Sequence, residues 1–446
     1  MDFSPHTEQD ERDMLEVIGL DGIEALFEAI PEPVRLDDPL RVPPALTEPE
    51  LVAELAAMAS GNTAQDLVCF AGGGAYDHYV PAAVKSLAAR AEFATSYTPY
   101  QAELSQGILQ ALFEFQSLVC AIYGMDIANA SLYDGANSVV EAVNLAVRAT
   151  GRGSVLVAST LHPHYREVLR TYTTGLGLDI RTAPFTDEGI VDWSKADASD
   201  AAAVVVAYPN VFGRLEDART ACATAHAHDA LAIVAADPTA MGILQSPGYM
   251  GADIAVGEGQ ALGNAMFYGG PYIGLFATKE RLVRQVPGRI SGETLDADGR
   301  RAFVLTLQAR EQHIRRAKAT SNVCTNQTLL AVAAGVHLAW LGPAGLAALG
   351  DACAARAASA AARLAAIPGC ALKFPGPHFK EFALETPIDG RALAGRLARR
   401  GWLAGPGLGD WYPELDRCLL VAATERRTED EIEAFAEAIA KELTEP

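Results

Sequence analysis

An aspartate that follows a buried strand marks the first candidate site in this sequence of 446 residues. Residues 230–236 (ALAIVAA) form a short, continuously apolar run, which is typical of a strand buried in a parallel sheet. Asp237 and Pro238 end this run. Open α/β sheets bind ligands just beyond the carboxyl ends of such strands, so we expect Asp237 to lie at a ligand site.

The stretch after Asp237 has features of a pyridoxal-phosphate (PLP) site but lacks the lysine that such a site requires. In many PLP enzymes an aspartate in this place pairs with the pyridinium nitrogen of the cofactor, and a lysine further along the chain forms the Schiff base. No lysine occurs between Asp237 and Lys279. The residues therefore indicate a PLP-type pocket without its covalent anchor.

Two further segments could bind an anion or a ligand near this pocket. Residues 134–138 (DGANS) begin a valine-rich helix whose free N–H groups could hold a phosphate, although Asp134 is equally compatible with an ordinary N-cap. Residues 70–79 (FAGGGAYDHY) are glycine-rich, contain Tyr76 and His78, and could let the backbone approach a ligand closely. A plain turn is the alternative for this second segment.

A polar loop and a basic cluster complete the candidate chemistry. Residues 97–107 (YTPYQAELSQG) gather polar and aromatic groups before an apolar helix over 108–123, which suits a binding loop. Residues 310–318 carry five basic side chains in a chain with a net charge of −21, which suggests an anionic ligand. If this segment is helical, Glu311 and Arg315 form an i,i+4 pair on a solvated face instead.

Strand-like runs separated by helix-length spans predict a mostly parallel sheet covered on both faces. We expect a helical segment over 1–65, a large α/β domain over 66–335 and a small α+β domain over 336–446. The predicted strands of the large domain cover residues 154–158, 178–183, 202–208, 231–236, 253–256 and 272–277.

Composition narrows the class of protein. The net charge of −21 argues against nucleic-acid and anionic-membrane surfaces, and the apolar runs are shorter than the roughly 18 residues that cross a bilayer. Seven scattered cysteines without a CxxC pair indicate reduced thiols, and the acidic N-terminus carries no secretory signal, so we expect a cytoplasmic protein. The histidine pairs 162/164 and 226/228 do not predict a metal site.

Several motifs, in order along almost the whole chain, resemble the P-protein (glycine decarboxylase) family of the glycine cleavage system. The resemblance is to subunit 1, the N-terminal-half type of the two-subunit form. Two small departures are Ala317, where an acidic residue is usual, and Phe3, where tyrosine is common. The motifs are YDHYVP (76–81), YTPYQAELSQG (97–107), YPNVFG (208–213), YGGP (268–271), REQHIRR (310–316) and KATSN (318–322).

The resemblance implies an aspartate-aminotransferase-like fold of PLP type I, in which only a homologous second subunit carries the Schiff-base lysine. Gln260 stands at the lysine position of this chain, and Asp134, Asn137 and Asp237 mark a vestigial pocket. PLP would be held by the partner subunit, and the two subunits would assemble as an α2β2 tetramer. The pair would decarboxylate glycine, release CO2 and transfer the aminomethyl group to the lipoyl group of the H-protein, the reaction of glycine dehydrogenase (aminomethyl-transferring).

The same resemblance suggests which residues of this chain reach the shared active site. Tyr76 and His78 are expected beside the loop 97–107. The loop residues expected to act on the substrate are Tyr97, Tyr100, Glu103, Ser105 and Gln106. The residues expected to line a substrate or lipoyl channel are Arg310, His313, Arg316, Lys318 and Asn322.

Two other functions fit the sequence. A self-sufficient PLP enzyme would have to use Lys279 or Lys318, although Lys279 follows the predicted strand 272–277 and so lies past the usual loop. A scaffold or regulatory homologue of a PLP enzyme would explain the missing lysine equally well.

Overall fold

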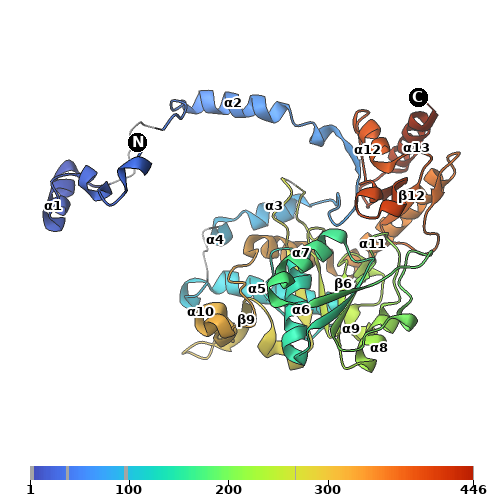
Figure 1. Ribbon diagram of the computed structural model, residues 1–446, viewed down its shortest axis with the longest axis horizontal. Coiled ribbons are helices and arrows are strands. Elements are labelled where there is room, and N and C mark those ends of the chain that lie inside the picture. The colour runs from blue at the N-terminus through green and yellow to red at the C-terminus, as the bar shows by residue number, and fades with distance from the viewer. Residues whose placement is uncertain (1–4, 37–39, 95–98, 267, 445–446) are drawn as a thin grey trace. The chain divides into compact units, whose positions relative to one another are not determined.

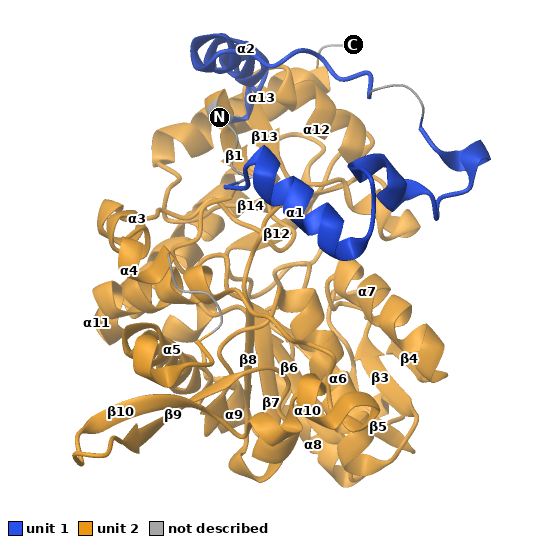
Figure 2. Ribbon diagram, turned by 90° about the vertical axis from the view of Figure 1, so that its left-hand side faces the viewer, with its two compact units in different colours: residues 1–65 blue, residues 66–446 orange. Residues whose placement is uncertain are grey.

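The computed structural model describes residues 5–36, 40–94, 99–266 and 268–444, and the chain divides into two compact units, residues 1–65 and 66–446 (Figure 2). Two capping boxes start the two longer helices of the first unit, one between Thr7 and Asp10 and one between Thr47 and Glu50. The helical elements of this unit are α1 (Glu8–Ile18), η1 (Ile23–Phe27), η2 (Glu32–Val34) and α2 (Glu48–Ser60).

A seven-stranded sheet has the strand order β2-β8-β7-β6-β5-β3-β4. It lies at the centre of the second unit, surrounded by helices (Figure 1). The pairs from β7 to β4 are parallel, whereas β8 runs antiparallel to both β7 and β2. The predicted mostly parallel sheet is therefore confirmed. Its strands are β2 (Ile127–Ala128), β3 (Ser154–Ala158), β4 (Asp179–Ala183), β5 (Ala201–Tyr208), β6 (Leu231–Ala236), β7 (Ile254–Glu258) and β8 (Gly274–Thr278).

Helices cover both faces of this sheet because successive strand residues point to opposite sides. In β6, Ala232 and Val234 pack with α5 (Gln106–Tyr123), α8 (Ala218–Ala227) and the first half of α11 (Thr328–Ala365). The alternate residues of β6 pack with α6 (Gly135–Thr150) and α7 (Pro163–Thr173). The carboxyl ends of the parallel strands are thereby left as the natural place for a pocket.

The C-terminal part builds a second, smaller core. Its antiparallel sheet is β11-β12-β14, and β1 (Val68–Phe70) pairs in parallel with β13 (Trp402–Ala404), a pairing that the sequence did not predict. Phe70 stacks on Phe435 with ring centroids 4.2 Å apart, which ties the start of this unit to its end. The remaining elements of this core are β11 (Ala371–Leu372), β12 (Glu381–Glu385), β14 (Cys418–Ala422), α12 (Gly390–Ala398) and α13 (Glu429–Thr444).

The long helix α11 connects the two cores. By length and composition it could cross a membrane, but Gly342 has non-helical backbone angles (φ 61°, ψ −178°) and divides it. Ala331 and Ala334 belong to the core of the large sheet, and Ala360 and Leu364 belong to the smaller core. This helix therefore has the features of a core helix of a globular protein.

A hairpin and several short turns follow the large sheet. The strands β9 (Ile290–Leu295) and β10 (Arg301–Thr306) pair only with each other among the described residues. The helix expected around 310–316 is broken into short turns, of which α10 (Gln312–Arg315) is the longest. The expected surface pair of Glu311 and Arg315 is wrong, because Glu311 is buried where α10 begins. Three short helices lie elsewhere in the second unit: α3 (Ala82–Ala88), α4 (Ala91–Ala94) and α9 (Pro247–Met250).

Candidate functional site

A small pocket opens beyond the carboxyl ends of β5, β6 and β7. Asp237 follows β6, Glu258 ends β7, and Gln260 lies two residues further on. Lys380 and Glu381 enter the same pocket from the C-terminal part of the chain. The space that remains has a volume of about 80 Å³. Asp237 thus lines a pocket at the edge of the sheet where a ligand site was expected, and side chains fill most of this pocket.

Lys380 places its ammonium group on Asp237. Its Nζ lies 2.6 Å from Asp237 Oδ2 and donates to Thr239 Oγ1 at 3.3 Å. The same atom lies 3.8 Å from the centroid of the Tyr76 ring, and the Lys380 side chain is only 2% exposed. Burial alone would raise the pKa of Asp237, but the Lys380 charge and the Thr239 hydroxyl hold it below its usual value. Asp237 and Lys380 therefore form a buried ion pair.

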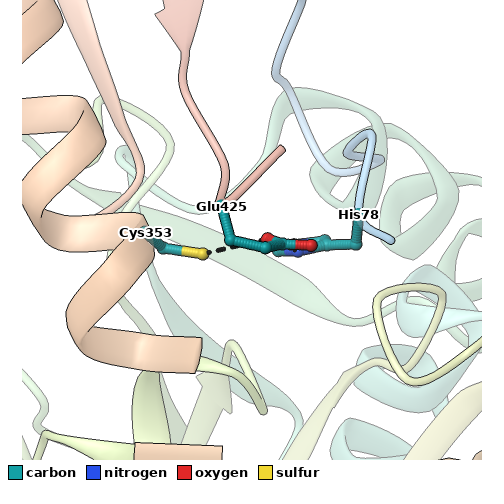
Figure 3. A group of neighbouring side chains, drawn as sticks. All are labelled: His78, Cys353 and Glu425. Carbon is teal, nitrogen blue, oxygen red and sulfur yellow. Dashed lines mark hydrogen bonds and ion pairs between the residues drawn. The ribbon is translucent and has the colours of Figure 1, made fainter. Parts of the chain in front are cut away.

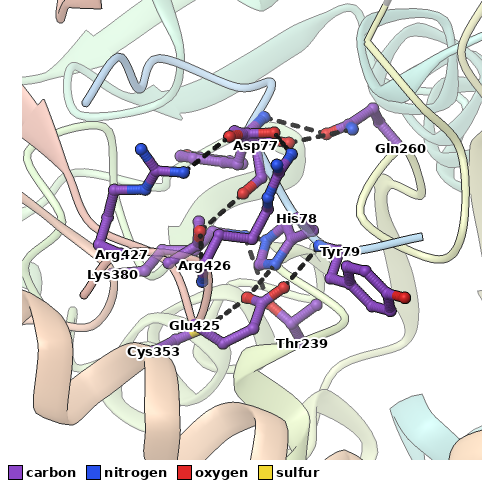
Figure 4. Close-up of polar contacts among 12 residues, drawn as sticks. Asp77, His78, Tyr79, Thr239, Gln260, Cys353, Lys380, Glu425, Arg426 and Arg427 are labelled. Carbon is purple, nitrogen blue, oxygen red and sulfur yellow. Dashed lines mark hydrogen bonds and ion pairs between the residues drawn. The ribbon is translucent and has the colours of Figure 1, made fainter. Parts of the chain in front are cut away.

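His78 connects Lys380 to Glu425 (Figure 4). Its Nε2 lies 3.1 Å from Lys380 Nζ, and its Nδ1 lies 2.8 Å from Glu425 Oε2. Because an ammonium can only donate, Nε2 accepts and Nδ1 carries the proton that is donated to Glu425. Burial and the Lys380 charge lower the pKa of His78, which keeps the ring neutral. Burial would raise the pKa of Glu425, but the hydrogen bonds from His78 and the Tyr79 N–H lower it to about 2.

His78, Cys353 and Glu425 have ligand atoms within 4.8 Å of one another, a spacing that a metal ion could use (Figure 3). Their contacts favour a hydrogen-bonded group instead. Cys353 Sγ lies 3.4 Å from Glu425 Oε2, and burial raises the pKa of this thiol well above its usual value, so it is protonated. The second nitrogen of His78 faces the Lys380 ammonium, which would repel a cation placed here.

The glycine-rich loop approaches the chain's own Glu381 rather than an external ligand. A Cβ atom added to Gly72 would overlap Glu381 Oε2, and Gly73 N–H donates to that oxygen at 3.0 Å. The Tyr76 hydroxyl donates to Glu381 Oε1 at 2.7 Å. Burial raises the pKa of Glu381 to about 7 despite these hydrogen bonds. The glycines allow a close approach to the backbone, but the group that approaches is the Glu381 side chain and not a ligand.

Glu258 occupies the helix start at which a phosphate was expected. Its Oε2 accepts from the Gly135 N–H at 2.9 Å, and its Oε1 accepts from the N–H groups of Gln260 at 3.0 Å and Ile273 at 3.2 Å. Burial raises the pKa of Glu258 to about 8 in spite of these bonds. Asp134 accepts from the Asn137 N–H at 2.7 Å as an ordinary N-cap. The α6 start is thus satisfied from within the chain.

Gln260 uses its whole amide on neighbouring backbone. Its Oε1 accepts from the Tyr76 N–H at 3.0 Å, and its Nε2 donates to the carbonyls of Tyr76 at 3.1 Å and Asn264 at 2.8 Å. The side chain is buried. Gln260 therefore fixes the glycine-rich loop against the segment after β7.

These residues do not fit PLP. Asp237, which would have to face a pyridinium nitrogen, is already paired with Lys380, and the Gly135 N–H is already bonded to Glu258. Gln260 cannot form a Schiff base, since an amide is not a nucleophilic amine. The remaining volume of about 80 Å³ is also well below the roughly 300–1,000 Å³ of typical cofactor sites.

The predicted loop forms a separate, exposed face. Tyr97 lies outside the described residues. Tyr100 is 51% exposed, its ring lies 5.9 Å from the His313 ring, and Arg289 Cζ lies 5.6 Å from its centroid. The structure therefore brings together Tyr100 and His313, which the sequence had singled out in different motifs.

Gln106 anchors this loop to the β9–β10 hairpin. Its Nε2 donates to the Phe303 carbonyl at 2.8 Å, and its Oε1 accepts from the Phe303 N–H at 2.9 Å. Glu103 and Gln106 line a groove of about 750 Å³ between the start of α5 and the hairpin, together with Arg301. Ser105 is half-buried where α5 begins.

The basic cluster separates into a structural residue and an exposed group. The Arg310 guanidinium donates to the carbonyl oxygens of Val286 and Gly288, which holds the segment before β9. Arg316, Lys318 and Asn322 are exposed. Tyr76 and His78 belong to the buried pocket network described above.

Comparison with known proteins shows the family to which this chain belongs. The family model of the glycine cleavage system P-protein matches residues 1–439. The chain belongs to this family. A probable glycine dehydrogenase (decarboxylating) subunit 1 from Desulforamulus reducens is 48% identical over 440 residues, which cover 98% of each chain. A subunit 1 of the same name from Moorella thermoacetica is 47% identical over 98% of this chain and 99% of its own.

Solved structures agree with this assignment to the P-protein family. A crystal structure of glycine decarboxylase (P-protein) in inhibitor-bound form is 44% identical, with a TM-score of 0.91 over 99% of this chain and 100% of that chain. The sphingosine-1-phosphate lyase structure of Burkholderia pseudomallei is 17% identical, with a TM-score of 0.67 over 92% of this chain and 93% of its own, and shares the fold. The predicted PLP type I fold is therefore confirmed.

Sequence reasoning missed the residues that fill the pocket of this P-protein chain. One signal was available for Lys380 and Glu381. If residues 380–384 (KEFAL) form a strand, Lys380 lies on the same face as the apolar side chains two and four positions later, and a charge on that face needs a buried partner. No comparable signal marked Glu258 or Glu425, because each acquires its role only from loops that the fold brings near.

Proposed function

We propose that this P-protein chain is subunit 1 of a two-chain glycine decarboxylase whose other subunit holds PLP. The observation that carries the proposal is the pocket beyond β6, which has the position of a PLP site and is filled by Lys380, Glu258 and Gln260. A chain of this family with a filled pocket has to act together with a cofactor-bearing partner. The names of its relatives, which call them subunit 1, are consistent with such a partner.

In the proposed assembly, glycine loses its carboxylate as CO2 and its aminomethyl group passes to the lipoyl group of the H-protein. PLP, when bound by the partner, supplies the electron sink for the loss of CO2. We infer two copies of each subunit, an α2β2 assembly, in the cytoplasm. The chain described here contributes side chains and a surface to that assembly.

The contribution we propose for this chain is the exposed face around Tyr100 and Glu103. The loop is anchored at Gln106 by two hydrogen bonds to the hairpin, so its exposed side chains are held in place. Arg289 and His313 stand beside the Tyr100 ring, and the Arg289 guanidinium is itself held by the Asn326 side chain and the Cys324 carbonyl. The Tyr100 and Glu103 side chains are thus presented from a fixed surface. At the mouth of the partner's site, these groups would orient glycine and exclude water from the reacting carbon.

Two alternative functions differ from the proposal in where the cofactor resides or in what the loop contributes. A self-sufficient enzyme would need Lys279 or Lys318, but Lys279 Nζ donates to the Gly124 carbonyl at 3.4 Å, Lys318 is exposed, and neither residue lines the pocket. A scaffold subunit would bind the partner without contributing to the chemistry.

Borohydride trapping tests where the cofactor resides. We expect the purified chain to show no absorbance near the aldimine band with PLP and no labelled lysine after reduction, because the pocket has little space and its lysine, Lys380, is a buried ammonium paired with Asp237. The partner subunit, alone or in the complex, is expected to be labelled. Labelling of Lys279, Lys318 or Lys380 in this chain would contradict the proposal and favour the self-sufficient enzyme.

Substitutions in the loop test the proposed contribution to catalysis. We expect Tyr100→Ala and Glu103→Gln each to lower kcat/KM of glycine–CO2 exchange by the reconstituted pair by roughly 10- to 100-fold, since each removes a group that orients or shields the substrate. The matched controls are Tyr172→Ala and Glu167→Gln, both exposed on α7 and expected to leave the rate unchanged. Unchanged exchange by both loop variants in an intact complex would instead support the scaffold function.

A further inference from the structure

A buried arginine connects the loop at Tyr100 to a second segment of the chain. Arg289 directly precedes β9, and only 6% of it is exposed. Its Nη2 donates to the Cys324 carbonyl at 2.6 Å, and its Nη1 donates to Asn326 Oδ1 at 3.1 Å. Its Cζ lies 5.6 Å from the centroid of the Tyr100 ring. One guanidinium therefore contacts both the loop and the segment that precedes α11.

The chemistry of these contacts requires the shape of a guanidinium rather than its charge alone. The two acceptors of Arg289 are neutral oxygens, a carbonyl and an amide, and the third contact is an aromatic ring. A guanidinium is planar and carries five N–H donors in a fixed fork, so it donates along its edges while its face lies against a ring. A lysine ammonium keeps the charge but has neither the fork nor the plane.

Asn326 extends the arrangement to a strained turn. Its Nδ2 donates to the Ala130 carbonyl at 2.7 Å, while its Oδ1 accepts from Arg289. Ser131 is fully buried and has a φ of 97°, in the left-handed region that residues other than glycine rarely adopt. Its Oγ accepts from the Gln327 N–H at 3.1 Å. Such strain persists only where the surroundings hold it, and it concentrates at functional sites.

The outer side of the segment before α11 faces solvent. Cys324 and Thr325 are exposed, as is Tyr100. Thr325 Oγ1 donates to the Tyr133 hydroxyl at 3.1 Å, which fixes a pair of hydroxyl groups there. Because both segments contact Arg289, the Tyr100 ring and these exposed residues lie within one small region of the surface.

We infer that Arg289 is a positioning residue of the shared site, which holds the Tyr100 ring and residues 324–326 in one fixed arrangement. This inference rests on the proposed function, in which the loop at Tyr100 orients glycine. The Arg289 guanidinium is buried against the Cys324 carbonyl and the Asn326 side chain, so it acts through Tyr100 rather than on the substrate. Residues 324–326 are then a second part of the same site.

A double-mutant cycle on glycine–CO2 exchange by the reconstituted pair tests this coupling. We expect Arg289→Met and Arg289→Lys each to lower kcat/KM by roughly 10- to 100-fold, because neither side chain can hold both segments. Tyr100→Ala added to either variant should lower kcat/KM by less than about threefold more, since the ring has already lost its place.

The matched control for the cycle is Arg152→Met. The Arg152 guanidinium also donates to two carbonyl groups, those of Ala201 and His228, but these belong to the large sheet and to α8. We expect this variant to leave kcat/KM within about twofold of the wild type and to combine additively with Tyr100→Ala.

Hydrogen exchange of the free full-length chain tests the positioning independently of the reaction. We expect amide exchange over residues 99–106 and 321–328 to rise at least about tenfold in both Arg289 variants. Asn326→Ala keeps the arginine but removes its side-chain partner, so it should have the same effect on residues 321–328 and keeps the test decisive if Arg289→Met does not fold. The Gln327 N–H, which is bonded to Ser131, reports on this segment directly. Arg152→Met should leave both regions protected as in the wild type.

The results separate failure of the inference from failure of the proposed function. Unchanged exchange of both regions in the Arg289 variants overturns the inference, and so do additive effects of Arg289→Lys and Tyr100→Ala on kcat/KM. Near-normal kcat/KM in Arg289→Lys would mean that the charge suffices, which also overturns it. If Tyr100→Ala is impaired and the Arg289 variants are not, the inference alone fails. If none of them is impaired, the loop assignment fails together with the inference.

Discussion

Lys380→Met is expected to lower the free energy of unfolding by about 3–5 kcal/mol, because it leaves the Asp237 carboxylate, whose side chain is only 16% exposed, without its counter-ion. The cost is that of the unpaired charge rather than of the lost attraction. The variant also removes the donor to His78 Nε2 and the cation over the Tyr76 ring. Chemical denaturation followed by circular dichroism, or the shift in Tm where unfolding is irreversible, measures the effect.

Two further variants test whether the effect of Lys380→Met comes from the unpaired charge. The double variant Lys380→Met with Asp237→Asn removes both charges and should recover most of the lost stability. Lys373→Met breaks a comparable pair with Glu385, at 3.3 Å, whose side chains are 30% and 32% exposed, and should cost less than about 1 kcal/mol. If Lys380→Met lowered the free energy of unfolding as little as Lys373→Met, the pocket would have to be open to water rather than filled by side chains.

The sheet of this chain could be predicted from sequence because its signals are local. The runs at 154–158 and 231–236 match β3 and β6 residue for residue, since a strand buried on both faces is apolar throughout. The strand β1 was missed because Val68–Phe70 is short and acquires its partner β13 only from the distant C-terminal part. Pairing between segments so far apart depends on the assembled fold rather than on the residues themselves.

The pocket residues also fall into those that local sequence signals could predict and those that only the fold brings together. Asp237 was found because its position follows from the strand before it, and Gln260 because the family motif fixes the spacing. Lys380 lies more than a hundred residues from Asp237, and the residues around Lys380 do not indicate that Asp237 is its ion-pair partner. The sequence therefore predicted a PLP-type pocket without its lysine, and the fold shows Asp237, Glu258 and Gln260 bonded to groups of the same chain.

Glu381→Gln is expected to change how stability depends on pH. Burial raises the pKa of Glu381 from its ordinary 4.5 to about 7, so between these values the folded protein keeps a proton that the unfolded chain has released. Stability contributed by this group is thus fully present below pH 4.5 and is lost as the pH rises through 7, at about 1.4 kcal/mol per pH unit. The glutamine stays neutral, so the variant should exceed the wild type by up to about 3 kcal/mol at pH 8 and equal it near pH 4.5.

Glutamine suits this test because it can keep both hydrogen bonds of Glu381. Its oxygen can accept from the Gly73 N–H, and its amide nitrogen can donate to the Tyr76 hydroxyl oxygen. Glu385→Gln, four residues along the same strand and partly exposed, is the matched control and should change stability by less than about 1 kcal/mol at either pH. Some slope should remain in Glu381→Gln, since burial also raises the pKa of Glu258, to about 8.

Unfolding curves measured from pH 4.5 to 8.5 decide which charges the pocket carries. If the two proteins converge at low pH, Glu381 is protonated in the folded chain, and the Lys380 charge is balanced by Asp237 alone. The pocket then has no uncompensated charge with which to attract the phosphate or the pyridinium of a cofactor. If the stability of the two proteins instead changes in parallel with pH, Glu381 is ionised in the folded chain and the pocket carries excess negative charge. The small volume and the absence of a lysine at position 260 would then be the reasons that PLP does not fit.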